Sequence, residues 1–164
     1  MKKLLLFTAM AAAVSAQAGA PMQSVLDQYI KIQTALAGDS LKGVPEATAQ
    51  IASIAKTSEG AVPENIAERA QAVAKATDIK AAREAFKPLS TALIAAFANQ
   101  KSLSGDYYEA FCPMANASWI QSGKNISNPF FGSSMSSCGE IRNSLGGAPQ
   151  TSLPAKGGMG CCGS

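Results

Sequence analysis

The spacing of apolar residues between positions 22 and 97 is the feature that most constrains the fold of this 164-residue chain. These residues recur at intervals of three and four, which places them on one stripe of a helix. The first stripe consists of Met22, Val25, Tyr29, Ile32 and Leu36. Three further segments show a similar periodicity: residues 41–54, 63–73 and 79–97. The sequence therefore predicts an all-α fold, in which four amphipathic helices pack as an antiparallel four-helix bundle.

Local signals indicate where these helices begin and end. Gly38 can end the first helix, and Pro63 stands at a position typical of a helix start. The side-chain oxygen of Thr77 or Asp78 can cap the fourth helix. Pro88 lies inside the fourth pattern and lacks an amide hydrogen, so we expect it to kink this helix or to split it in two.

The first 18 residues have the features of a secretory signal peptide. Lys2 and Lys3 form a positive start, an apolar run follows, and Ala16-Gln17-Ala18 provides a cleavage site. The apolar run is too short for a permanent membrane span. Cleavage would remove both lysines and lower the formal net charge from +3 to +1. We therefore expect an exported protein that lacks the strongly basic surface needed to bind nucleic acid.

The segment from Tyr107 to Ile141 differs in character from the helical part. It contains the only tryptophan, two of the three tyrosines and three of the six phenylalanines. Its first residues, 107–111, fit either a short strand or the end of a helix. Asn128-Pro129 and Gly132 are turn signals that would fold the chain back on itself. We expect an irregular C-terminal segment attached to the bundle.

Two thiols and two thioethers in this segment form a candidate metal site. Cys112 and Met114 stand two residues apart, and Met135 and Cys138 stand three apart in the opposite order. Thiolate and thioether ligands favour Cu(I), while zinc and iron–sulfur clusters also use thiolates. The chain contains no histidine, which Cu(I) does not require. We therefore predict a Cu(I) site without an organic cofactor, shielded by Trp119, Phe130 and Phe131.

A disulfide is the alternative use of the same cysteines. An exported protein meets conditions that permit disulfides, and four cysteines allow three pairings. Because adjacent Cys161 and Cys162 would form a strained ring, the simplest pairing is a Cys112–Cys138 bridge. Met114 and Met135 would then only fill gaps in the core, and the protein would be a non-catalytic interaction module. We expect no enzyme in either case. The chain has no histidine, which is the usual general base, and it has no phosphate-loop or nucleophile motif.

The chain thus divides into three predicted parts. Residues 1–18 form the signal peptide, and residues 19–145 form the helical domain with its Cys- and Met-containing segment. Residues 146–164 are rich in glycine, proline and serine, which is typical of a flexible tail.

Several short motifs of the chain resemble the signature of a known family. They are Cys112-Pro113-Met114-Ala115, the single Trp119, Asn128-Pro129-Phe130-Phe131-Gly132, Met135-x-x-Cys138-Gly139-Glu140 and, upstream, Arg83-Glu84-x-Phe86-x-x-Leu89-Ser90. The family comprises exported bacterial helical domains of unknown function. They occur alone or attached to the periplasmic adaptor subunits of heavy-metal (copper and silver) efflux pumps of the RND type. The resemblance extends from about Val25 to Ile141.

The resemblance implies a periplasmic helical domain that handles copper or silver. A ligand role carries over to Cys112, Met114, Met135 and Cys138 alone. The tail residues Met159, Cys161 and Cys162 are additional to the family pattern, and they either collect or pass metal or have no role. The implied partner is an efflux adaptor or another copper carrier, and the implied cargo is Cu(I) or Ag(I).

Overall fold

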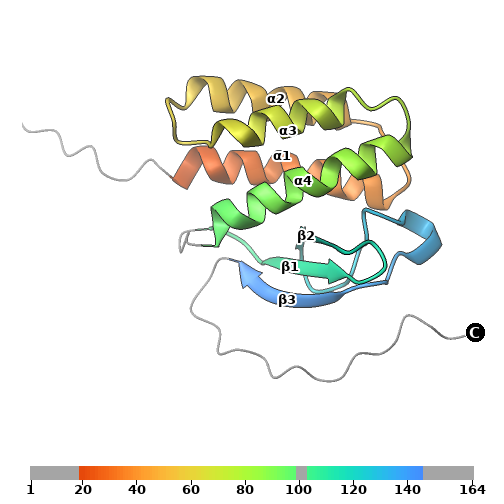
Figure 1. The fold of residues 1–164 in the computed structure, drawn as a ribbon. Coiled ribbons are helices and arrows are strands. Elements are labelled where there is room, and N and C mark those ends of the chain that lie inside the picture. Colours follow the sequence, from red (N-terminus) through yellow and green to blue (C-terminus); the bar gives the residue numbers. More distant parts are fainter. Residues whose placement is uncertain (1–18, 99–102, 146–164) are drawn as a thin grey trace, which may run out of the picture.

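The computed structural model describes residues 19–98 and 103–145, which form four helices followed by a small β-sheet (Figure 1). The helices are α1 (Gly19–Ala37), α2 (Val44–Thr57), α3 (Glu64–Ala74) and α4 (Ile79–Phe97). The strands are β1 (Tyr107–Cys112), β2 (Ala117–Ser122) and β3 (Glu140–Leu145), and a short 3-10 helix, η1 (Gly132–Met135), precedes β3. The predicted signal peptide and tail lie outside the described residues.

The four helices lie where the apolar periodicity predicts them. They run in alternating directions, and each packs against the next along the chain, while α4 also contacts α1 (Figure 1). The predicted stripes are buried, as Tyr29, Phe86 and Leu93 illustrate with no exposed surface. Asp78 caps α4, because its Oδ1 accepts a hydrogen bond from the Ala81 N–H at 2.8 Å.

Pro88 does not split the fourth helix, so of the two expected outcomes the division in two was wrong. The helix is continuous from Ile79 to Phe97 with Pro88 inside it. Pro88 is exposed, whereas Phe86 and Leu89 on either side are fully buried. Its carbonyl oxygen accepts a hydrogen bond from Arg69 Nη1 on α3 at 2.9 Å. Burial of the flanking apolar residues outweighs the lost backbone hydrogen bond here.

The prediction of an all-α fold with an irregular C-terminal segment was also wrong. Residues 107–145 contain a three-stranded antiparallel sheet with the strand order β2-β1-β3. In β1 the buried side chains alternate with partly exposed ones: Tyr108, Ala110 and Cys112 are buried. In β2 three consecutive residues, Trp119 to Gln121, are buried instead. The structure is therefore mixed α and β, and its strands lack a shared alternation that would reveal the sheet in the sequence.

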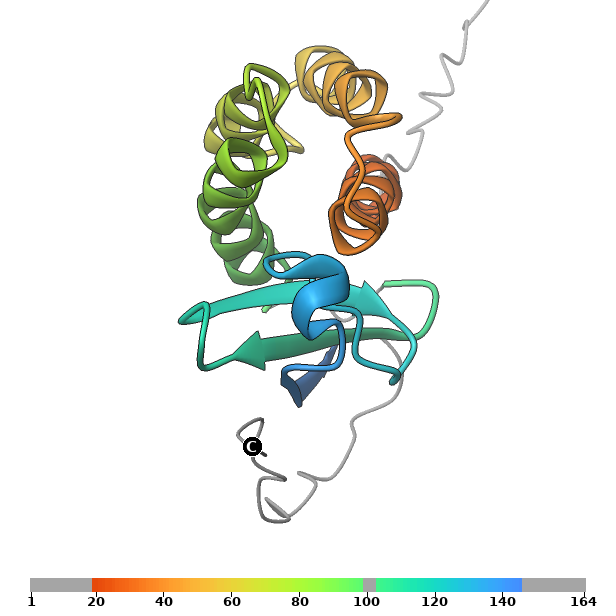
Figure 2. The ribbon, with the colours of Figure 1, turned by 90° about the vertical axis from the view of Figure 1, so that its right-hand side faces the viewer.

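The sheet meets the helices with the edge formed by β2. Figure 2 shows β2 nearest to α1 and α4, followed by β1 and then β3. The Ile120 N–H on this edge donates a hydrogen bond to the Tyr29 hydroxyl of α1 at 3.1 Å. The same hydroxyl lies 2.8 Å from Ser90 Oγ of α4. Complete burial raises the pKa of Tyr29 far above its ordinary value, so the hydroxyl keeps its proton even near pH 10, where an exposed tyrosine ionises.

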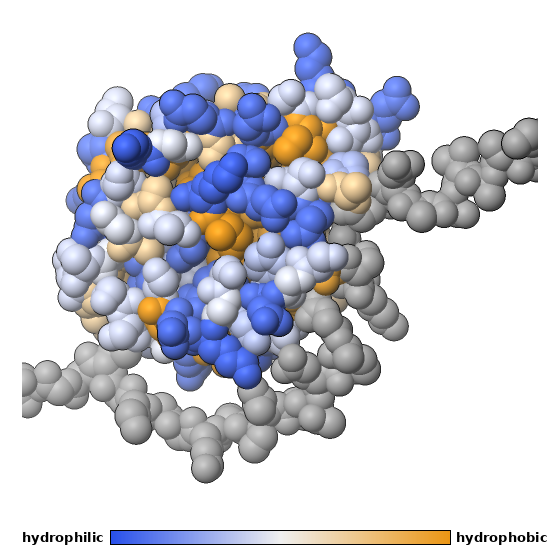
Figure 3. Space-filling model, turned by 180° about the vertical axis from the view of Figure 1, so that it is seen from behind, coloured by the Kyte–Doolittle hydropathy of each residue, from blue (hydrophilic) through white to orange (hydrophobic). Residues whose placement is uncertain are grey.

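Aromatic side chains join the helices and the sheet in one core. Tyr29 stacks on Phe86 with ring centroids 4.9 Å apart, and Phe86 contacts Phe130 at 6.1 Å. Phe130 and Trp119 on β2 form a T-shaped pair with ring centroids 5.8 Å apart. Outside the core, the face in Figure 3 shows apolar side chains only in small patches among hydrophilic ones. No helix in residues 19–98 or 103–145 is long and apolar enough to cross a bilayer.

Candidate functional site

Two of the four predicted ligands, Cys112 and Cys138, lie in contact and are called the thiol pair below. Cys112 is the last residue of β1, and Cys138 lies just before β3. Their Sγ atoms are 3.2 Å apart, which is a contact distance and not the roughly 2.0 Å of a disulfide bond. Both residues are buried, with exposures of 0% and 4%. The chain therefore brings together two thiols that are 26 positions apart in the sequence.

The two methionines differ in their surroundings. Met114 lies in the turn between β1 and β2, where Asn116 has a φ of +46° and its N–H bonds to the Pro113 carbonyl. The Met114 side chain is 57% exposed. Met135 ends η1, is partly buried, and its carbonyl accepts a hydrogen bond from the Cys138 N–H at 3.0 Å. A ligand role for the four sulfur atoms stays a prediction.

Trp119 and Gly139 shape the surroundings of the thiol pair. Trp119 is fully buried, and its indole N–H donates to Gln121 Oε1 at 3.0 Å. Gly139 follows Cys138 directly and has a φ of +149°; a Cβ there would lie 2.7 Å from the Trp119 ring. Only glycine lets the backbone after Cys138 approach the indole so closely. The indole therefore packs against the backbone that directly follows Cys138.

Residues 123–139 are called the site loop below. Gln121 organises the first half of this loop. This side chain is 1% exposed and uses all four of its hydrogen-bonding positions. Its Oε1 accepts from Trp119 Nε1 and from the Ser127 N–H, and its Nε2 donates to the carbonyls of Gly123 and Asn125. Sequence reasoning missed Gln121, because a glutamine two residues after a tryptophan gives no local signal. Its role depends on the path of a loop that comes later in the chain.

Arg83 and Asp39 tie the site loop to the helices. Arg83 Nε donates to the Pro129 carbonyl at 2.9 Å, and its Nη2 donates to the Leu36 carbonyl and to Asp39 Oδ1 at 2.9 and 2.6 Å. Asp39 Oδ2 accepts from the Ser133 N–H at 2.9 Å. Hydrogen bonds from Ser133, and then from Arg83, lower the pKa of Asp39 to about 2. The charged form of Asp39 therefore helps to hold the loop that carries Cys138.

Gly132 lies where Arg83 and Asp39 meet the loop. Its φ is +56°, and a Cβ at this position would collide with both side chains. The turn signal read from Gly132 thus coincides with a close approach between the loop and the helices.

The donor set limits which metals fit. Among residues 19–98 and 103–145, no three Cys, Asp or Glu side chains gather where they could hold a metal ion. A structural zinc site needs about four such ligands, whereas soft thiolate and thioether sulfur suits Cu(I). The thiol pair, with methionine sulfur nearby in the sequence, fits the soft monovalent ion better than zinc.

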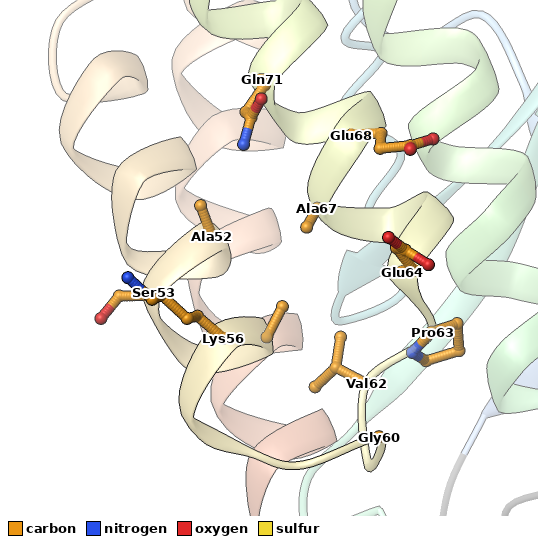
Figure 4. Close-up of a pocket in the computed structure, with 11 residues that line it drawn as sticks. Ala52, Ser53, Lys56, Gly60, Val62, Pro63, Glu64, Ala67, Glu68 and Gln71 are labelled. Atoms are coloured by element: carbon orange, nitrogen blue, oxygen red, sulfur yellow. The ribbon is translucent and has the colours of Figure 1, made fainter.

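Two grooves are lined by residues other than the thiol pair. The larger, about 810 Å³, runs between α2 and α3 and is lined by alanines such as Ala52 and Ala67, with Lys56, Glu64 and Glu68 at its rim (Figure 4). The smaller, about 440 Å³, lies between α4 and strands β1 and β2 and reaches Asn116 in the turn that carries Met114. Neither groove has a cysteine or a methionine in its lining.

The comparisons with known proteins concern the helical part of the chain. No curated protein and no solved structure matches the chain. Residues 25–105 match the sequence model of a family described as "Protein of unknown function (DUF3347)". The matched segment contains most of α1 and all of α2 to α4, and it ends before β1 and the thiol pair. Over its helices, this chain is therefore similar to an uncharacterised protein family.

Proposed function

We propose that this protein binds Cu(I) or Ag(I) in the periplasm and either buffers the ion or delivers it to an efflux system. The contact between Cys112 and Cys138 carries this proposal, because two soft sulfur atoms lie side by side in a buried position. The resemblance to domains attached to efflux adaptors supplies the biological setting.

Burial of the thiol pair supports a monovalent cation as its partner. Two thiolates in contact would repel each other, and a buried charge is tolerated only when it is paired or bound to a metal. The pair is therefore stable as two thiols, as a disulfide, or as two thiolates that share a cation. Cu(I) satisfies the third state with few ligands, and the proposal assigns Met135 and Met114 to complete its coordination.

The exposure of Met114 suggests how the ion would be exchanged. A thioether that is 57% exposed lies two residues from the fully buried Cys112. An ion arriving on a carrier would meet Met114 first and would then pass to the thiol pair. Met114 is thus the proposed exchange ligand, and the two cysteines are the proposed holding ligands.

The same contact also favours a second candidate, a disulfide-closed interaction module. Oxidation of Cys112 and Cys138 would close a loop of 26 positions, which by loop entropy stabilises the fold by about 3–4 kcal/mol. In that case the oxidised protein is the working form and metal has no role.

One measurement separates the two candidates. The exported protein is purified without reductant, and its intact native mass is determined with and without thiol alkylation. Bound copper, with Cys112 and Cys138 protected from alkylation only while the metal is present, is the expected result. A metal-free protein lighter by two hydrogen atoms, with the two cysteines joined, would favour the module, provided that reduction in the presence of Cu(I) restores no binding.

A volume-conserving double variant tests the thioether ligands. Met114→Leu combined with Met135→Leu should weaken Cu(I) binding while the fold survives, since leucine and methionine have similar volumes. Competition with a chromogenic Cu(I) chelator measures the affinity, and far-UV circular dichroism checks the fold. An unchanged affinity would exclude both methionines as ligands.

A further inference from the structure

Asn128 is a fully buried side chain whose polar atoms all act on the site loop. Its Oδ1 accepts hydrogen bonds from the Phe130 and Phe131 N–H groups at 2.8 and 3.3 Å. Its Nδ2 donates to the carbonyl oxygen of Cys138 at 2.7 Å, across ten positions of the chain.

The backbone of Asn128 is bound within the same loop. Its N–H donates to the Ser136 carbonyl at 2.9 Å, and its carbonyl accepts from the Gly132 N–H at 3.1 Å. One residue thus connects the start of the turn, the beginning of η1 and the chain just before Cys138.

These bonds restrict both peptide groups of Cys138. The Cys138 N–H is bound to the Met135 carbonyl, and its carbonyl is bound to the Asn128 amide. With both neighbouring peptide planes held, the Cα–Cβ bond of Cys138 has a defined direction, and Sγ lies against Cys112 Sγ. Loss of the bond from Asn128 would remove a hydrogen bond from a buried carbonyl and would let this peptide rotate.

We infer that Asn128 is the positioning residue of the thiol pair: its amide holds the backbone of Cys138 so that the two sulfur atoms meet. An amide suits this role because it accepts from the turn at one end and donates to Cys138 at the other. A carboxylate can accept but cannot donate, and a serine is too short to reach across the loop. Where it concerns metal, this inference rests on the proposed function, whereas the pairing of the two thiols does not.

The test measures how readily the two thiols pair. The full chain is equilibrated with reduced and oxidised glutathione, and the fractions of Cys112 and Cys138 in the bridge are quantified by alkylation and peptide mass spectrometry. In this reaction the two thiols lose two electrons and two protons and form one disulfide bond, while one glutathione disulfide is reduced to two glutathione thiols. The equilibrium constant reports the effective concentration of one thiol at the other.

Asn128→Asp keeps the acceptor for the turn and removes the donor to Cys138. We expect its equilibrium constant to fall about tenfold or more, in the range seen when partners that orient site ligands are removed. The matched control is Asn125→Asp, which places the same charge on an exposed position of the same loop and should stay within about twofold of the wild type. An Asn128→Asp value equal to that of the control would overturn the inference.

Asn128→Ser keeps the test decisive if the aspartate variant does not fold. Serine retains a short acceptor for the turn without adding charge, and it too should lower the equilibrium constant. Failure of both variants to show a native circular dichroism spectrum would contradict the inference, because Asn128 would then serve the fold as a whole. Cu(I) affinity is measured in parallel and should fall together with the equilibrium constant for disulfide formation. A wild type that binds no Cu(I) would refute the proposed function. In that case the glutathione result alone would decide the role of Asn128.

Discussion

The hydroxyl of Tyr29 on α1 connects this helix and α4 to the β2 edge of the sheet. Removal of the hydroxyl is a direct test of that connection. Tyr29→Phe keeps the ring and its stacking on Phe86 at 4.9 Å. It removes the acceptor of the buried Ile120 N–H and the partner of Ser90 Oγ. No large cavity is created, so the change isolates the hydrogen bonds.

The expected cost follows from the state of each partner in the variant. A buried N–H without an acceptor costs about 1–3 kcal/mol. Ser90 lies within α4 and can bond instead to a carbonyl of the preceding turn, so its contribution is small. We therefore expect a loss of about 2 kcal/mol in the free energy of unfolding. With a denaturant slope typical of a small domain, this lowers the urea midpoint by about 1 M.

Urea titration followed by circular dichroism measures this shift, and amide hydrogen exchange reports on the Ile120 N–H itself. The denaturant slope should not change, and Ile120 should exchange faster than in the wild type. Ser90→Ala is the matched control, since it removes the other hydroxyl and leaves the Ile120 bond in place. A midpoint within about 0.2 M of the wild type would refute the claim that this hydroxyl holds the sheet edge against the helices.

The raised pKa of Tyr29 adds a dependence on pH. Because folding raises the pKa of this group, its stabilisation is complete below the unfolded value near 10 and is lost as the pH rises further. The wild type should therefore lose stability above about pH 10 more steeply than Tyr29→Phe. Parallel curves for the two proteins would show that Tyr29 can ionise without unfolding.

Two further variants test the loop around the thiol pair. Gly139→Ala places a Cβ 2.7 Å from the Trp119 ring in a backbone conformation that suits glycine. We therefore expect the free energy of unfolding, measured in urea, to fall by about 2–4 kcal/mol. An unchanged urea midpoint would show that the indole moves aside. The pKa of Asp39 is lowered to about 2 from the model-compound value of 3.8, so its stabilisation is present above about pH 4 and is lost as the pH falls towards 2. Asp39→Asn should remove this acid-side loss in thermal melts between pH 2 and 5, and a wild-type curve that is already flat there would contradict the role of the carboxylate.

The positions of the helices could be read from the sequence because they depend on local rules. Apolar residues at intervals of three and four mark the buried stripe of each helix, and a capping side chain such as Asp78 acts on its own first turn. Only the expected division at Pro88 was wrong, because the packing of Phe86 and Leu89 outweighs one missing hydrogen bond.

The sheet could not be read in the same way because its strands are buried for different reasons. β1 is buried on one face, and β2 is buried both on the face of Trp119 and along the edge that Tyr29 covers. β3 is mostly exposed, with buried Leu145 only at its end. No common period survives in strands of this kind, so a six-residue strand is not distinguishable from irregular chain.

By itself, the sequence determined the helical stripes, their caps and the types of atom available for chemistry, since these depend on residue type and short-range spacing. It also predicted that Cys112 and Cys138 come together, either as ligands of one metal ion or as a disulfide. Only the tertiary structure decided how they meet: the two sulfur atoms lie 3.2 Å apart in a buried position, while Met114 stays exposed. The physical reason is that this contact depends on strand pairing and on buried amides such as Asn128, which bond across ten or more positions of the chain.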